Sequence, residues 1–223
     1  MTAIDTSPQI FWLASRALGI VAIVLLSLSV SLGLAMSGRL LRRPGLPAQL
    51  KRYHEASTLV TLGLIAAHGG VLLLDGYLRP SVAEVTLPFA LGYRPFWTGL
   101  GVIGGWLALI LAGSFYVRRW IGVKTWRWLH RWTLAVYILA LAHVIGAGTD
   151  GRSTWMLAVL TMLVTPSVFV LAYRRLPAAP RPAQTRSPKS PPRRHWLEPA
   201  AQPRRDPVEV RTTSATPDAS LEP

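Results

Sequence analysis

The chain has 223 residues, of which 51% are hydrophobic and only 15% are charged. This composition, with its long apolar runs, indicates an integral membrane protein, and the lack of cysteine excludes disulfide bonds, Cys-ligated metal sites and covalently attached c-type haem. The formal charge of +14 does not indicate nucleic-acid binding, because lysine and arginine gather at the ends of apolar runs and in the C-terminal segment.

Five apolar runs are long enough to cross a hydrocarbon core of about 30 Å as helices. They span about residues 10–36, 54–74, 98–117, 128–145 and 155–173. The first is not expected to be a cleavable signal, because Asp5 precedes it without a basic segment and the run is too long. The sequence therefore predicts an all-α integral membrane bundle of five transmembrane helices within residues 1–175. Pro166 can kink the last helix.

The distribution of basic residues predicts the orientation of the bundle. Residues 37–53 and 118–131 connect apolar runs and carry only basic charges, and two arginines follow the last run. The positive-inside rule places these segments in the cytoplasm. We therefore expect a multi-pass protein of the plasma (inner) membrane, with its N-terminus outside and its C-terminus inside. Residues 75–97, rich in proline and aromatic residues, then lie outside, where they either anchor the chain at the interface or cover a site.

Four of the five histidines stand near the ends of two apolar runs. His54 and His68 are 14 residues apart, and His130 and His143 are 13 residues apart. On helices these steps rise about 21 Å and about 19.5 Å, so each helix carries one histidine near each membrane surface. Neutral imidazole is a common axial ligand of haem iron, and ionisable residues inside a membrane are costly. A single histidine would be explained by a hydrogen bond to a carbonyl, whereas this arrangement of four favours two haems held without covalent links, as haem b is.

Helical phase treats the two histidine pairs differently. Fourteen steps of about 100° return to within about 40° of the starting face, so His54 and His68 share a face. Thirteen steps leave His130 and His143 about 140° apart on an ideal helix. The second pair therefore requires local tightening, a helix end near His143, or two haems at different azimuths.

Arg16 lies about one and a half turns inside the first apolar run. Its guanidinium either extends to the interface or pairs with a propionate of a haem bound on that side.

The composition changes at about residue 176 to proline, arginine, alanine, serine and threonine. Such a segment buries too little apolar surface to fold, so we expect residues 176–223 to be a disordered Pro/Arg-rich cytoplasmic tail. His195 in this tail is expected to be solvated rather than a ligand. The tail cannot form a flavin or nicotinamide domain, and no G-x-G-x-x-G motif follows a predicted strand.

Several motifs together resemble the ferric reductase-like transmembrane domain family. They are H-x13-H, an apolar run without histidine, W-R-W-L-H at the start of H-x12-H, and H-V-I-G-A-G-T-D. The family includes the membrane parts of NADPH oxidases and ferric reductases and MsrQ-like haem subunits, and the resemblance covers about residues 12–175. It implies a bundle that binds haem b, with His54 opposite His130 on the cytoplasmic side and His68 opposite His143 on the outer side. The topology implies the same pairs, because both histidine-bearing helices run from inside to outside.

The resemblance implies transmembrane electron transfer through haem to an outer-side acceptor that the sequence does not identify. The oxidases carry a further N-terminal span and a flavin and nicotinamide module, and this chain lacks both. A separate flavin reductase or a quinol is therefore expected to donate the electrons. Two alternatives belong to other classes of protein: a haem-binding membrane sensor or assembly protein without turnover, and a transporter in which the four histidines relay metal ions or protons.

Overall fold

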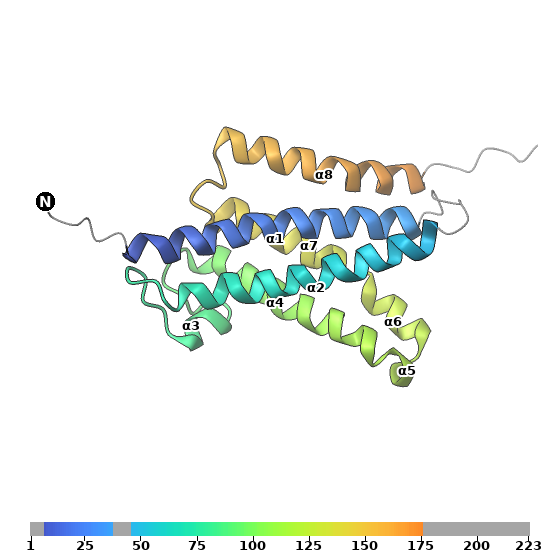
Figure 1. Cartoon of the computed structure of the whole chain (residues 1–223), viewed down its shortest axis with the longest axis horizontal. Helices are drawn as coiled ribbons and strands as arrows, with labels where there is room; N and C mark the ends of the chain where they lie inside the picture. Colours follow the sequence, from blue (N-terminus) through green and yellow to red (C-terminus); the bar gives the residue numbers. More distant parts are fainter. Residues whose placement is uncertain (1–6, 38–45, 176–223) are drawn as a thin grey trace, which may run out of the picture. The chain divides into compact units, whose positions relative to one another are not determined.

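The computed structural model describes residues 7–37 and 46–175, and these ranges form helices joined by turns and loops, without strands (Figure 1). The predicted tail, residues 176–223, lies outside the described residues, as do residues 38–45 of the predicted connection over residues 37–53. The helices are α1 (Ser7–Ser37), α2 (Leu46–Leu72), α3 (Val82–Thr86), α4 (Pro95–Tyr116), α5 (Arg118–Ile121), α6 (Val123–His130), α7 (Thr133–Ala147) and α8 (Thr154–Arg175).

Five segments of the described chain are long and apolar enough to cross a membrane: α1, α2, α4, α6 together with α7, and α8. This confirms the predicted fold class. Large apolar side chains face outward along these segments, for example Met162, which is 78% exposed, and Phe169, which is 67% exposed. In water such a surface would favour aggregation, whereas in a bilayer the lipid chains cover it and the helices satisfy their own backbone hydrogen bonds.

The predicted start of the second helix was wrong by eight residues. The structure begins α2 at Leu46, so Lys51 and Arg52 lie on its first turns rather than in a loop. Proline at the second position of this helix does not prevent it, because the first N–H groups of a helix have no intrahelical acceptor. The helix therefore extends beyond the apolar run that the sequence shows.

The fourth predicted helix, over residues 128–145, is two helices. The chain leaves α6 at His130 and enters α7 at Thr133. Between them the backbone N–H groups of Arg131 and Trp132 donate to carbonyls three residues earlier, at 3.1 and 2.9 Å. Bonds of this kind wind the chain at about three residues per turn, tighter than an α-helix.

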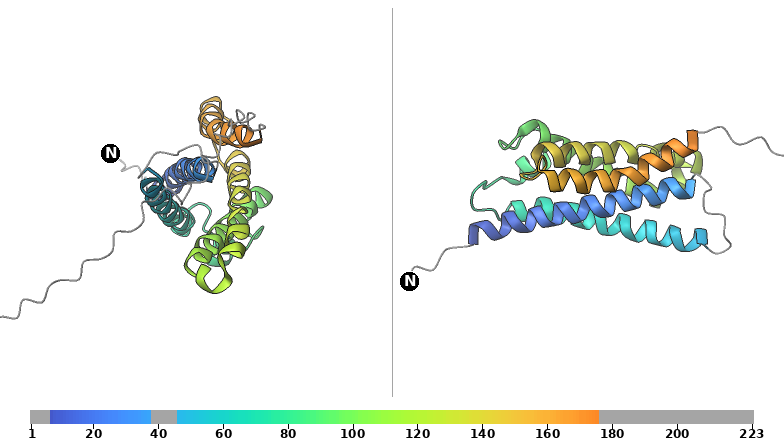
Figure 2. Two further views of the ribbon diagram at one scale, coloured as in Figure 1. Left: turned by 90° about the vertical axis from the view of Figure 1, so that its right-hand side faces the viewer. Right: turned by 90° about the horizontal axis from the view of Figure 1, so that it is seen from above.

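The helices pack as two pairs with α8 beside one of them (Figure 2). α1 runs along α2, α4 runs along α7, and α8 packs against α1. An apolar core between α1, α7 and α8 is formed by Ile23, Tyr137, Met156 and Leu160. The hydroxyls of Ser31 and Ser167 lie 2.8 Å apart and join α1 to α8, which is the kind of polar contact that holds helices together in lipid.

Short capped segments connect α2 to α4. α2 ends before Asp75, whose carboxylate accepts hydrogen bonds from the backbone N–H groups of Tyr77 and Leu78. α3 carries a capping box, in which Ser81 and Glu84 bond each other's backbone N–H groups. Proline occupies the first position of α4, where its missing N–H costs nothing.

Candidate functional site

The structure brings the four predicted histidines together in two pairs. His54 of α2 and His130 of α6 have ring centroids 6.1 Å apart, with ring planes at 88°. His68 of α2 and His143 of α7 have centroids 6.2 Å apart, with planes at 80°. We call these pairs the His54 site and the His68 site. The residues that pair are those that the resemblance and the topology predicted.

Local tightening resolves the phase problem of the second histidine pair. The turn between α6 and α7 has hydrogen bonds from Arg131, Trp132, Leu134 and Ala135 to carbonyls three residues earlier. Each residue wound in this way advances by about 120° rather than about 100°. The added rotation brings His130 and His143 toward one face, in agreement with local tightening, the first of the three alternatives that the sequence left open.

Two serines of α1 orient the histidines of α2. The Nδ1 atom of His68 lies 2.7 Å from the carbonyl oxygen of Ser15, and Nδ1 of His54 lies 3.0 Å from the carbonyl oxygen of Ser29. Because a carbonyl can only accept a hydrogen bond, each Nδ1 carries the proton and donates. Nε2 is then unprotonated in both rings and is the nitrogen available to bind a metal.

Two glycines of α1 let these rings approach the helix backbone. A Cβ atom placed on Gly19 would lie 3.1 Å from Nδ1 and Cε1 of His68, and one on Gly33 would lie 3.2 Å from Cε1 of His54. Each glycine stands four residues after the serine that holds the same ring. α1 therefore presents the arrangement Ser-x-x-x-Gly twice, at residues 15–19 and 29–33, once for each histidine.

α4 holds His143 in the same way. The Nδ1 atom of His143 donates to the carbonyl oxygen of Trp97 at 2.9 Å. A Cβ atom on Gly101, four residues later, would lie 2.5 Å from that Nδ1 and 2.8 Å from Cγ of the ring. This approach is closer than those at Gly19 and Gly33, so His143 depends most strongly on the missing side chain.

His130 is held differently. Within the described residues its ring makes no hydrogen bond to a carbonyl and instead stacks on Trp126, with centroids 5.3 Å apart and planes at 27°. Trp126 stands one turn earlier on α6, and its ring also makes an edge contact with Phe115 of α4, at 5.9 Å between centroids. The indole N–H of Trp126 is buried and has no acceptor among the described residues.

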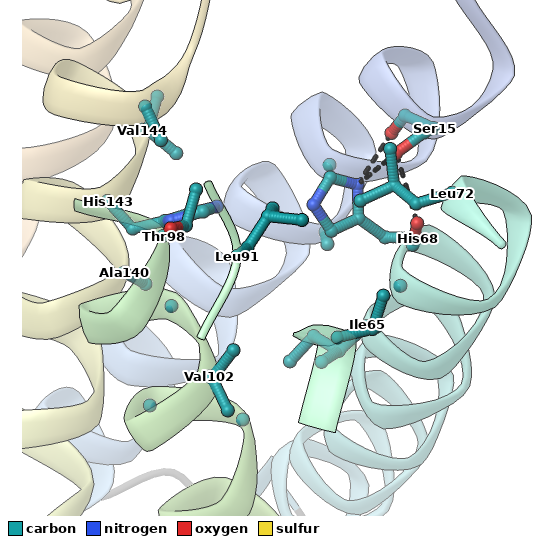
Figure 3. A pocket seen from close by; sticks show the side chains of 18 of the residues that line it. Ser15, Ile65, His68, Leu72, Leu91, Thr98, Val102, Ala140, His143 and Val144 are labelled. Atoms are coloured by element: carbon teal, nitrogen blue, oxygen red, sulfur yellow. Dashed lines mark hydrogen bonds between the residues drawn. The ribbon is translucent and has the colours of Figure 1, made fainter. Parts of the chain in front are cut away.

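A cavity of about 610 Å³ lies at the His68 site, between the α1–α2 pair and the α4–α7 pair. His68 and His143 reach into it from opposite walls, and apolar side chains such as Ile65, Leu91 and Val102 complete the lining (Figure 3). The volume is in the range of cavities that hold organic ligands and cofactors.

The segment between α2 and α4 covers this cavity. Leu87, Phe89 and Leu91 line it, and Phe89 packs on Gly99, where a Cβ atom would collide with the ring. This outcome supports the covering role, which the sequence offered as an alternative to anchoring at the interface.

At the start of α3, hydrogen bonds from the backbone N–H and the hydroxyl of Ser81 hold the pKa of Glu84 below its usual range.

Arg16 and Asp150 both line the same cavity, and the guanidinium of Arg16 forms an ion pair with the carboxylate of Asp150. It also lies over the ring of Trp12, 5.3 Å from the centroid. Arg16 therefore neither extends alone to the interface nor stands without a partner. The ion pair joins α1 to the turn after α7, which the sequence did not predict.

The residues that sequence reasoning missed are those that hold the histidines. The Ser-x-x-x-Gly arrangement recurs after 14 residues, which is also the spacing of His54 and His68, and this coincidence was a readable signal. The supporting role of Trp97 left no such signal, because only its backbone carbonyl accepts from His143, whereas the hydroxyls of Ser15 and Ser29 also lie 3.0 and 3.1 Å from Nδ1 of His68 and His54.

Comparison with protein families gives one match. A model of the ferric reductase like transmembrane component matches residues 18–141, more than half of the chain. The matched range contains His54, His68 and His130 and ends two residues before His143. Neither the curated proteins nor the solved structures include a match to this chain. The chain therefore belongs to the family of ferric reductase-like transmembrane components.

Proposed function

We propose that the chain is a transmembrane electron carrier that binds one b-type haem at the His54 site and one at the His68 site. The ring separations carry the proposal. A metal–imidazole bond is about 2 Å long, so two such bonds in line, with about 1 Å more on each side to the ring centre, separate the centroids by roughly 6 Å. The observed 6.1 and 6.2 Å agree with one metal ion between each pair of rings.

The residues at both sites fit haem better than a bare metal ion. Each pair supplies two nitrogen ligands, and residues 7–37 and 46–175 contain no group of three or more His, Cys, Asp or Glu side chains placed to hold a metal. A porphyrin supplies the four remaining ligands. The 610 Å³ cavity at the His68 site and the indole N–H of Trp126 at the His54 site, which has no partner among the described residues, support a bulky ligand with acceptor groups.

The four histidines favour electron transfer over reaction with a substrate at the metal. Bound haem supplies reversible one-electron chemistry. His54 with His130, and His68 with His143, would each hold one haem between two imidazoles and would leave no open position for a substrate. The 14-residue step from His54 to His68 rises about 21 Å along α2, so the two sites together connect the two membrane surfaces.

The proposed orientation places the His54 site near the cytoplasm, with the N-terminus outside and the C-terminus inside. Lys51, Arg52, Arg118 and Arg119 lie at the corresponding ends of α2, α4 and α5, and the positive-inside rule assigns such ends to the cytoplasm. A flavin reductase or a quinol is the proposed donor, and the acceptor lies on the outer side.

Haem content tests the assigned pairs directly. The full chain is purified from haem-replete cells, and a pyridine haemochrome assay measures haem type and haem per chain. Replacing both histidines of one site by alanine should remove one of two haems, whichever site is changed. The control His195→Ala should leave the spectrum intact. A colourless wild-type preparation, or loss of both haems in each double variant, would overturn the proposal.

Electron transfer is tested separately in vesicles. Protein in sealed vesicles with ferricyanide inside and dithionite outside should pass electrons inward through the membrane, and His68→Ala should slow this at least tenfold. Haem that is bound and reducible but transfers no electrons to the trapped acceptor would favour the alternative of a sensor or assembly protein.

A further inference from the structure

The four histidines differ in the partner that orients the ring. His54, His68 and His143 each donate the Nδ1 hydrogen to a backbone carbonyl, at 3.0, 2.7 and 2.9 Å. His130 has no such partner among the described residues and stacks on Trp126 instead. Both rings of the His68 site are therefore anchored by carbonyls, whereas the His54 site has one anchored ring and one stacked ring.

Trp126 is itself held firmly enough to act as a support. It lies one turn before His130 on α6, so the two rings meet as neighbours on one helix face. The Trp126 ring makes an edge contact with Phe115 of α4. The guanidinium of Arg118 lies over the Phe115 ring, 3.8 Å from its centroid. Arg118 also donates to the carbonyl oxygen of Phe115 at 2.7 Å. The chain of contacts from Arg118 to Trp126 restricts the plane that His130 can adopt.

The difference in partners has an electronic consequence for a metal bound between the rings. An imidazole that donates its second N–H to a carbonyl becomes a more basic ligand. A more basic ligand stabilises the oxidised, more positively charged iron, and hydrogen bonds to the ligands are one means by which a protein lowers a haem potential. Stacking on an indole fixes the ring plane but does not add negative charge to the ring in this way.

We infer that Trp126 positions His130 by stacking, in place of a carbonyl acceptor, and that the haem at the His54 site therefore has a higher reduction potential than the haem at the His68 site. This inference rests on the proposed function, because it concerns haem bound by the four histidines. It goes beyond that function in assigning a role to Trp126 and an order to the two potentials.

The order of the potentials is measured on two variants of the full chain that each keep one haem. His68→Ala retains the His54 site, and His54→Ala retains the His68 site. Redox titration followed in the haem absorption bands should give the higher midpoint potential for His68→Ala, and the wild type should titrate as the sum of the two. Equal potentials, or the reverse order, would overturn the inference even though two haems are bound.

The role of Trp126 is measured by electron paramagnetic resonance of the ferric protein. The nearly perpendicular imidazole planes at both sites predict low-spin signals with one large g value. Trp126→Leu removes the stacked ring, so the signal of the His54 site should broaden and shift while that of the His68 site stays unchanged. Trp126→Phe keeps an aromatic ring and should restore the wild-type signal.

Trp128→Leu is the matched control, because Trp128 lies on the same helix, is 56% exposed and contacts Trp132 rather than His130. Its spectrum should match that of the wild type. An unchanged His54-site signal in Trp126→Leu, or an equal change in Trp128→Leu, would refute the positioning role. If Trp126→Leu does not fold, the comparison of the two single-haem variants still decides the order of the potentials. Absence of haem from the wild type would instead refute the proposed function.

Discussion

The α1–α2 pair and the α4–α7 pair each position two histidine rings, but only the α1–α2 pair does so with a repeated arrangement. On α1, residues 15–19 and 29–33 repeat one arrangement, a serine whose carbonyl anchors an imidazole and a glycine four residues later that makes room for it. The repeat length of 14 residues equals the spacing of His54 and His68 on α2. Because 14 residues make nearly four turns, two helices that run antiparallel can repeat the same contact at both depths.

The α4–α7 pair provides this arrangement only once. Trp97 and Gly101 hold His143, but His130 lies 13 residues before it, and a continuous α-helix would turn the two rings to different faces. The helix is interrupted between α6 and α7, and His130 lies opposite His54. Its ring stacks on Trp126 instead of donating to a carbonyl. With a histidine spacing of 13 residues instead of 14, the α4–α7 pair therefore has one carbonyl-and-glycine support rather than two.

The largest expected effect is that of Gly101→Ala, which fills the space that the His143 ring occupies against α4. The new methyl group would lie 2.5 Å from Nδ1 of His143, and the ring cannot retreat without losing its bond to Trp97. We expect loss of the haem at the His68 site, measured as a halving of haem per chain. Gly113→Ala on the same helix is the control, because nothing lies within 4 Å of its new methyl group. A full haem complement in Gly101→Ala would show that His143 does not need this space.

Gly19→Ala and Gly33→Ala test the regular pair and should have smaller effects. Their methyl groups would lie 3.1 and 3.2 Å from the rings of His68 and His54, so a shift of a few tenths of an ångström relieves each contact. We expect each variant to bind both haems but to release the affected haem severalfold faster to an apo-globin acceptor. Gly63→Ala and Gly70→Ala on α2, which meet nothing within 4 Å, should release haem at the wild-type rate. Alanine favours a helix over glycine by about 1 kcal/mol, so faster release would occur against the change in propensity.

The sequence predicted the membrane helices and the histidine pairs because both depend on patterns along one chain. Runs of apolar residues reveal a span, and a fixed spacing reveals which ends of two parallel helices face each other. The supports were not predicted, because a carbonyl acceptor such as that of Trp97 belongs to every residue and only the tertiary arrangement selects one.

The break after His130 illustrates a second limit of the sequence. No proline or glycine marks residues 128–134, so the residues themselves favour one continuous helix. The spacing of the histidines indicated that the helix must depart from regular geometry, but not where; the structure places the break directly after His130. The ion pair of Arg16 was missed for a similar reason, since Asp150 is distant in the sequence and appeared only as part of a short loop.

Replacing Arg16 or Asp150 tests the bond that joins the two helix pairs at the His68 site. The side chains are 33% and 23% exposed, so the pair is partly screened. Arg16→Gln and Asp150→Asn should each lower stability by about 1 kcal/mol, which corresponds to roughly 2–4 °C in Tm for a chain of this size. The double variant should lose less than the sum of the two, as measured by thermal unfolding of matched samples.

The same variants test the predicted role of Arg16 toward a haem propionate. If Arg16 also binds a carboxylate of the ligand, Arg16→Gln should weaken haem at the His68 site more than Asp150→Asn does. Equal haem retention in the two variants would restrict Arg16 to the ion pair with Asp150.

The smallest expected effect is a pH dependence of α3, which lies between the two pairs and touches both. Val85 packs on Gly69 of α2, and the indole of Trp106 on α4 donates to the carbonyl oxygen of Thr86 at 2.8 Å.

The hydrogen bonds from Ser81 lower the pKa of Glu84, so the unfolded segment binds more protons than the folded one. The stabilisation is therefore complete above the unfolded pKa of about 4.3 and is lost as pH falls from there through the folded pKa. Amide hydrogen exchange over residues 82–87 should accelerate across this window beyond the intrinsic change. Glu84→Gln should remove the pH dependence, because its amide does not titrate. If the wild type and Glu84→Gln responded alike to acid, the capping box would not control how firmly α3 covers the cavity.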